Sequence, residues 1–191
     1  RSFDRETALE AALNVFWAKG YDGASMADLT GAMGINKPSL YAAFGDKDAL
    51  FAETIARYAE RYFGGALQAF LSESSPEKAV HAALLAALEG ATRADTEAVG
   101  CLLAVGAAPT AVSRPWIGEQ VKHLLAGAVE AMTERFERDK AAGALSNGFP
   151  SRRRAWLLLE LIEGQAFRAR FGESRDDIAC SIQERVNAVL G

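Results

Sequence analysis

Residues 25–51 read SMADLTGAMGINKPSLYAAFGDKDALF, and the architecture of the chain can be inferred outward from them. Ser25 and Asp28 have the spacing of a capping box, which begins a helix, and Gly34 is typical of a helix end. Asn36 can cap the helix that follows, because its side chain can accept a bond from a free backbone N–H. The sequence therefore predicts two short helices joined by a tight turn.

Short helices joined by a glycine-containing turn are typical of a helix-turn-helix, whose second helix enters the major groove of DNA. At the start of that helix, Lys37 can meet phosphate or guanine, and Ser39 can bond to either. Tyr41 offers phosphate a hydroxyl donor. Helix starts at Ser25 and Asp46 present free N–H groups to phosphates. The motif thus predicts a DNA-reading unit.

Apolar residues recur at helical spacing through the rest of the chain, and strand alternation is nearly absent. The fold class is therefore all-α with about nine helices. They are expected near residues 4–19, 25–34, 36–45, 46–71, 75–93, 99–108, 113–143, 150–171 and 174–190. We expect residues 1–50 to form a helix-turn-helix head and residues 51–191 a ligand-binding and dimerisation body.

Residues 25–51 resemble the DNA-binding segment of TetR (tetracycline repressor-like) family transcriptional regulators. The marks of this resemblance are Gly20–Tyr21, Ser25, Gly34–Ile35, Leu40–Tyr41, Phe44 and Lys47-Asp48-Ala49-Leu50. The resemblance implies that Ser25 and Lys47 grip phosphates, and that residues 36–39 face the groove. The predicted DNA contacts are Ser25, Asn36, Lys37, Pro38, Ser39, Tyr41 and Lys47. Ala42 and Ala43 depart from the family, which often has an aromatic residue or histidine there, so the operator preference differs.

The charge balance counts against nonspecific DNA binding. The net charge is -4, and residues 1–50 hold five Lys/Arg against seven Asp/Glu. Any DNA-binding surface must therefore be local and built partly from helix dipoles. Without the resemblance, a helical bundle that never meets DNA would remain the more frequent interpretation.

The body shows no catalytic constellation, so we expect no enzyme, no cofactor and no metal. His81 and His123 lack a His or Cys at metal-ligand spacing, and ordinary surface or core histidines are the simpler interpretation. Arg152–Arg154 is interpreted as a solvated helix start rather than a nucleic-acid patch. No apolar run is long enough to cross a membrane, and two scattered cysteines fit a reducing cytosol. We therefore expect a cytoplasmic protein.

The resemblance implies a small-molecule pocket within the body. The candidate effector residues are Phe70, Leu88, Cys101, Leu102, Val105, Trp116, Leu125 and Trp156, each of which can equally be plain core. Cys101 lies near an expected helix start, where a lowered thiol pKa would make it reactive toward electrophiles. The alternative is that Cys101 is a small buried hydrophobe.

Apolar residues on more than one face of 150–171, with the apolar repeat of 174–190, predict a four-helix homodimer interface. The predicted function is a repressor that leaves a palindromic double-stranded DNA operator when a small molecule binds the body. The alternatives are a DNA binder that activates or acts outside transcription, and an all-helical ligand carrier or enzyme. The operator and the effector are not identified by the sequence.

Overall fold

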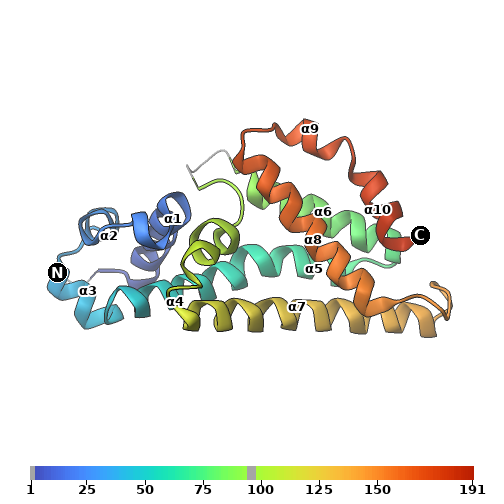
Figure 1. Ribbon diagram of the computed structural model, residues 1–191, viewed down its shortest axis with the longest axis horizontal. Helices are drawn as coiled ribbons and strands as arrows, with labels where there is room; N and C mark the ends of the chain where they lie inside the picture. Colours follow the sequence, from blue (N-terminus) through green and yellow to red (C-terminus); the bar gives the residue numbers. More distant parts are fainter. Residues whose placement is uncertain (1–2, 94–97) are drawn as a thin grey trace.

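The computed structural model describes residues 3–93 and 98–191, and within these ranges the chain is helical with no strand. The all-α prediction is confirmed. Three helices form one end of the molecule, the head (Figure 1). They are α1 (Arg5–Gly23), α2 (Met26–Met33) and α3 (Lys37–Phe44). Gly20 has φ +72° and ψ 171° inside α1, so the regular helix stops there, as its position in the sequence predicts.

One continuous helix leads from the head into the body. It consists of α4 (Lys47–Tyr58), the π-helical turn η1 (Ala59–Phe63) and α5 (Gly64–Ser72). The helix-forming φ and ψ values persist through both junctions, so the rod is wound differently at η1 but is not broken. The expected helix 46–71 is therefore present, with a π turn that its periodicity did not predict.

The remaining elements form the body and pack around this rod. They are α6 (Pro76–Ala91), η2 (Leu103–Ala107), η3 (Ala108–Thr110), α7 (Pro115–Ala141), α8 (Ser151–Arg170), α9 (Arg175–Ala179) and α10 (Ile182–Leu190). The longest of them, α7, runs along the lower edge of the molecule in Figure 1, from beneath the head to the far end. The C-terminus lies at the end of the molecule opposite α3.

Two expected helices differ from the prediction. The segment 99–108 is not a regular α-helix, because its main turns are the π turn η2 and the 3-10 turn η3. The segment 174–190 is two helices, since Cys180 and Ser181 interrupt it between α9 and α10. Both differences concern hydrogen-bond register, which apolar spacing alone does not determine.

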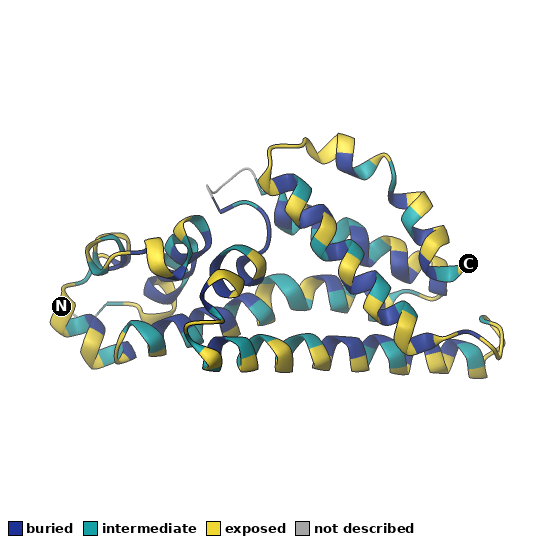
Figure 2. Ribbon diagram, viewed as in Figure 1, coloured by how far each residue is buried: buried dark blue, intermediate teal, exposed yellow. Residues whose placement is uncertain are grey.

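Head and body share one continuous apolar core. Each helix carries a buried stripe toward it and an exposed side away from it (Figure 2). Where the head meets the rod, the ring of Phe16 lies 4.8 Å from that of Phe51 and 6.1 Å from that of Tyr21. The body meets the head closely at Gly106, where an added Cβ would lie 3.3 Å from the carbonyl oxygen of Phe16. The head therefore packs directly against η2.

Within the ranges that the structure describes, none of the helices is both long and apolar enough to cross a membrane.

Candidate DNA-binding surface

The helix-turn-helix is built from local caps. The hydroxyl of Ser25 accepts a bond from the N–H of Asp28 at 3.0 Å, and the carboxylate of Asp28 accepts from the N–H of Ser25 at 3.0 Å. Gly34 closes α2 in the left-handed conformation, with φ +65°. The Asn36 side chain then accepts from the N–H of Ser39 at 2.9 Å and begins α3. These contacts set where α2 begins and ends and where α3 begins.

α3 presents one side to the core and the other to solvent. Leu40 and Phe44 are buried against the head, whereas the Tyr41 side chain is 52% exposed. Of the predicted groove-facing residues, Asn36, Lys37 and Pro38 are exposed and Ser39 is half-buried. The structure therefore brings these predicted contacts together at one exposed helix start. Asn36 also caps that helix, so its side-chain oxygen is already occupied.

Ser25 is exposed, but its side chain already forms the hydrogen bonds that cap α2. Its hydroxyl donates to Asp28 Oδ2 at 2.7 Å, while Lys19 Nζ donates to Asp28 Oδ1 at 2.6 Å. The hydrogen bonds from Lys19 and Ser25 hold the pKa of the Asp28 carboxyl well below its usual range. Ser25 therefore positions the start of α2, and a phosphate there would meet backbone N–H groups.

The start of α4 lies beside the end of α1. Asp46 caps α4 by accepting from the N–H of Ala49 at 2.8 Å. The ammonium of Lys47 lies 4.3 Å from the centroid of the Tyr21 ring, and partial burial lowers the pKa of Lys47. Lys47 is half-buried, so its charge is held at the junction of α1 and α4 rather than fully extended into solvent.

A polar network between head and body was not found from the sequence. The guanidinium of Arg114, at the start of α7, bonds to Asp48 at 3.3 Å and lies 4.5 Å from the centroid of the Tyr21 ring. The hydroxyl of Thr110 donates to Asp22 at 3.2 Å. Tyr21 and Asp48 belong to the recognised head motif. Arg114 follows them by more than sixty residues, and no local pattern pairs it with them.

The structure separates the eight candidate effector residues. A cavity of about 30 Å³ lies between α1, α4, η1, α6, α8 and the segment before η2, and of the eight only Cys101 lines it. Phe70, Leu88 and Leu102 are fully buried core, and Trp156 is 40% exposed on α8. The other three, Val105, Trp116 and Leu125, are half-buried.

The hypothesis of a reactive Cys101 with a lowered pKa is wrong in its physical basis. Its side chain is buried, and burial together with the nearby Glu163 carboxylate raises the pKa of the thiol to about 12. Desolvation of a thiolate outweighs any benefit from a nearby helix start. The alternative interpretation, a small buried hydrophobe, fits the observed burial.

The all-helical fold and the exposed α3 define the helix-turn-helix class of DNA-binding protein. A family profile described as "Bacterial regulatory proteins, tetR family" matches residues 8–54. At 32% identity, the chain resembles a TetR transcriptional regulator from Rhodococcus sp. RHA1 over 98% of this chain and 99% of that one, with a TM-score of 0.58. The chain belongs to the tetR family of bacterial regulatory proteins. The relatives that it matches are named as transcriptional regulators and repressors.

Two further relatives bear on function. The TetR family regulator CifR, solved as a cysteine mutant with 26bp double-strand operator DNA, matches 98% of both chains at 29% identity with a TM-score of 0.85. The HTH-type transcriptional repressor ComR of Escherichia coli (strain K12) is 39% identical over 102 residues. That match spans 53% of this chain and 48% of ComR, so the chain matches only about half the length of this curated relative.

Proposed function

We propose that this protein is a transcriptional repressor that binds a palindromic double-stranded DNA operator as a homodimer and leaves it when a small molecule binds the body. The observation that carries the DNA-binding part is the exposed start of α3, where Lys37 and Tyr41 project from a helix whose opposite side is anchored by Leu40 and Phe44. Residues 1–50 would serve as the head and 51–191 as the body. CifR, whose fold this chain shares, is described with operator DNA.

The acidic composition is compatible with this function because the candidate surface is local. The α3 start carries Lys37 and no acidic residue in its first turn, and backbone N–H groups add positive potential there. Affinity for an operator would then depend on a few phosphate contacts, together with base contacts from residues 36–41. A repressor that acts on chromosomal DNA would work in the cytoplasm.

The dimer proposal rests on an exposed apolar stripe along α8 and its C-terminal cap. Trp156, Phe167 and Phe171 are 40%, 63% and 74% exposed, and they lie on one side of the helix with exposed Gly164 between them. Large apolar side chains exposed together are typical of an interaction surface, and a glycine permits close helix approach. A second copy of α8 fits because a two-fold interface uses the same surface on both subunits.

The 174–190 segment contributes to this interface differently from the sequence-based expectation. Its apolar residues Ile178, Ile182, Val186 and Val189 are buried within the subunit. They contact α6 and α8 of their own chain, so their repeat is explained without a partner. The proposed interface therefore centres on α8, flanked by the exposed polar side of α10.

Footprinting of the purified protein on genomic DNA tests this function. We expect protected palindromes with two half-sites about one helical turn or a multiple of a turn apart. Light scattering of the same preparation should give the mass of a dimer. A monomer that protects no site, including the promoter of its own gene, contradicts the proposal. Protected sites whose genes lose expression when the protein is deleted would instead identify an activator.

A further inference from the structure

The cavity beside Cys101 lies where the head meets the body. Its walls come from α1 in the head, from the rod at Tyr58 and η1, and from α6 and α8 in the body. Aromatic rings and small residues line it: Trp17, Tyr58, Tyr62, Phe63, Ala66, Ala87, Gly90, Ala91, Gly100, Cys101, Ile162, Glu163 and Ala166. Its volume of about 30 Å³ is enough for roughly two water molecules.

Trp17 provides an unused donor in this wall. Its side chain is only 1% exposed, and its Nε1–H has no hydrogen-bond partner among the residues that the structure describes. Burial of a donor without an acceptor is unfavourable, so such groups are usually satisfied. A ligand oxygen or nitrogen that accepts from Trp17 would recover this free energy. The indole therefore selects for a hydrogen-bond acceptor.

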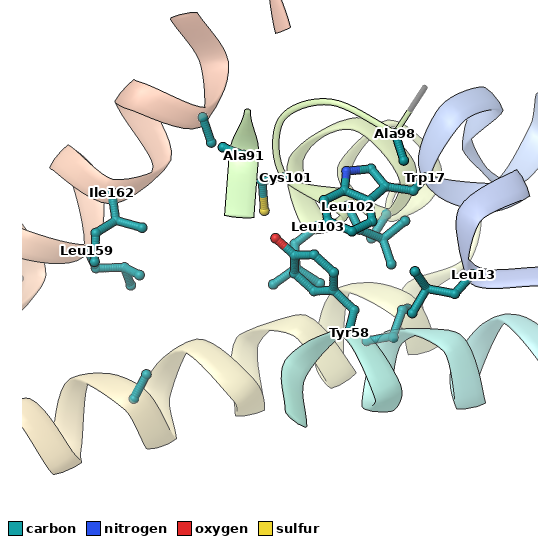
Figure 3. Close-up of a cluster of buried hydrophobic side chains, with 14 of the residues drawn as sticks. Leu13, Trp17, Tyr58, Ala91, Ala98, Cys101, Leu102, Leu103, Leu159 and Ile162 are labelled. Carbon is teal, nitrogen blue, oxygen red and sulfur yellow. The ribbon is translucent and has the colours of Figure 1, made fainter. Parts of the chain in front are cut away.

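Other polar groups that line the cavity include those of Tyr58, Cys101 and Glu163. The phenol oxygen of Tyr58 lies next to the sulfur of Cys101 (Figure 3), and the thiol of Cys101 donates to Glu163 Oε1 at 3.5 Å. Burial raises the pKa of Glu163 and, well above the usual range, that of Tyr58. A carboxyl group and two weak acids in a desolvated wall disfavour an anionic ligand.

A cationic ligand is disfavoured by a charge already present at the aromatic wall. The guanidinium carbon of Arg93 lies 4.8 Å from the centroid of the Tyr62 ring and 5.9 Å from that of the Trp17 ring. These ring faces would otherwise attract a ligand ammonium group, but they already hold a positive charge. The desolvated acidic groups on one side and the Arg93 guanidinium on the other therefore favour an uncharged ligand.

The cavity must widen to hold anything larger than a few atoms. Two of its wall residues, Tyr62 and Phe63, are half-buried and lie on the π turn η1, while η2 begins two residues after Cys101. Isolated π turns are uncommon and frequently lie at functional sites. None of the η1 residues is fully buried. A displacement of η1 therefore disrupts fewer buried contacts than a displacement of the other walls.

We propose that this cavity is the effector site, and that its ligand is an uncharged, ring-sized molecule with an oxygen acceptor bonded to Trp17 Nε1–H. This inference rests on the proposed function as a ligand-released repressor. A ring entering between Trp17 and η1 displaces η1, and η1 belongs to the same rod as α4. Because α4 begins beside α3, the displacement changes the position of the DNA-reading helix relative to the body.

Binding of four small probes to the full-length protein without DNA tests the ligand class. Phenol is uncharged and carries the acceptor, toluene has the same shape without it, benzoate is an anion and benzylamine is a cation. By calorimetry we expect phenol to bind, toluene to bind about tenfold more weakly, and the charged probes not to bind detectably. Absence of phenol binding at millimolar concentration overturns the proposal. Toluene binding equal to that of phenol also overturns it.

Two variants locate the site. Trp17→Phe keeps the aromatic wall and removes the N–H, so phenol should bind about tenfold more weakly while toluene binding is unchanged. Ala91→Leu fills the cavity and should abolish binding of both. The matched control Trp116→Phe removes an indole N–H on α7, outside the cavity lining, and should change neither affinity. If phenol binds both cavity variants as it binds the unchanged protein, the site is elsewhere and the proposal is wrong.

Operator binding separates this inference from the proposed function. Each preparation is also titrated with footprinted operator DNA, with and without phenol, by fluorescence anisotropy. Operator binding that phenol weakens in the unchanged protein, but not in Ala91→Leu, supports both proposals. Operator binding that persists in a protein that ignores phenol overturns the cavity assignment alone. If the unchanged protein does not bind operator DNA without phenol, the proposed repressor function itself is contradicted.

Discussion

The hydroxyl of Tyr21 donates a hydrogen bond to the carboxylate of Asp48. Tyr21 lies at the end of α1 and Asp48 in the first turn of α4, so this bond joins the head to the start of the rod. Arg114 reaches the same carboxylate from the start of α7. The carboxylate of Asp48 therefore links the ends of α1, α4 and α7. The effect of these bonds on stability can be measured.

Tyr21→Phe removes the donor to Asp48 and keeps the ring that packs on Phe51. Hydrogen bonds to charged acceptors contribute about 1.5–3 kcal/mol, so we expect the free energy of unfolding to fall by an amount of that order. Urea denaturation measures it. Tyr41→Phe is the control, because Tyr41 is half exposed on α3 and should leave stability unchanged. Equal effects of the two substitutions would show that the Asp48 bond contributes nothing.

The same hydrogen bond gives a signature at alkaline pH. Burial and the Asp48 bond raise the pKa of Tyr21 to about 12, above its ordinary value of 10.0. A raised pKa means that its contribution to stability is complete below pH 10 and is lost as the pH rises toward 12. In urea denaturation across this window, the unchanged protein should lose more stability than Tyr21→Phe. Parallel pH profiles for the two proteins would contradict the shift.

Lys37→Ala tests the proposed phosphate contact at the start of α3. Loss of one phosphate contact per subunit should weaken operator binding and reduce the dependence of log K on log salt by about 0.9 per contact. Fluorescence anisotropy over a range of salt concentrations measures both. Lys122→Ala removes another exposed lysine, on α7, and serves as the control. If the two variants give the same salt slope, Lys37 does not contact phosphate.

Gly20 has a backbone conformation that only glycine adopts readily. With φ +72° and ψ 171°, and with the carbonyl oxygen of Val105 3.4 Å from a built Cβ, Gly20→Ala should cost about 1–3 kcal/mol. Gly127→Ala is the opposite case, because Gly127 lies within α7 with open space around it. That substitution should stabilise the protein by about 0.5–1 kcal/mol. Thermal unfolding that ranks the two variants the other way would contradict this reading of Gly20.

Phe167→Glu tests the proposed dimer surface. Phe167 is 63% exposed in the subunit, and a carboxylate there would be buried against its own copy. We expect a folded monomer by light scattering and operator binding at least tenfold weaker, since one head reads half a palindrome. The control Val112→Glu places the same charge at a 93% exposed site and should remain a dimer. A Phe167→Glu dimer would place the interface elsewhere.

The sequence predicted the head because its signals are local. Ser25, Asn36 and Asp46 each cap a helix through a contact three residues away, so spacing alone reveals them. The contact between Arg114 and Asp48 joins distant parts of the chain, and no short pattern encodes it. The π turns have apolar spacing like that of α-helices, so the periodicity of the sequence did not distinguish them.

The cavity and the Cys101 pKa depended on burial, which a single sequence does not provide. The unused N–H of Trp17 is evident only once its neighbours are placed. Cys101 was correctly located near a helical turn, yet its environment is set by Tyr58 and Glu163 from other elements. Periodicity therefore located most of the helices, apart from the segments 99–108 and 174–190, whereas the pKa of Cys101 and the lining of the cavity depend on packing and were not predicted.

The π turn at Ala59–Phe63 also has a geometric consequence for the whole regulator. A π turn holds one residue more than an α turn, and each residue of an α-helix advances the winding by roughly 100°. Deleting a single residue there, with ordinary winding restored, would swivel α4 and everything attached to it by that angle. The length of this one turn thus sets the direction in which each α3 of a dimer faces, and with it the spacing of half-sites that the pair can span.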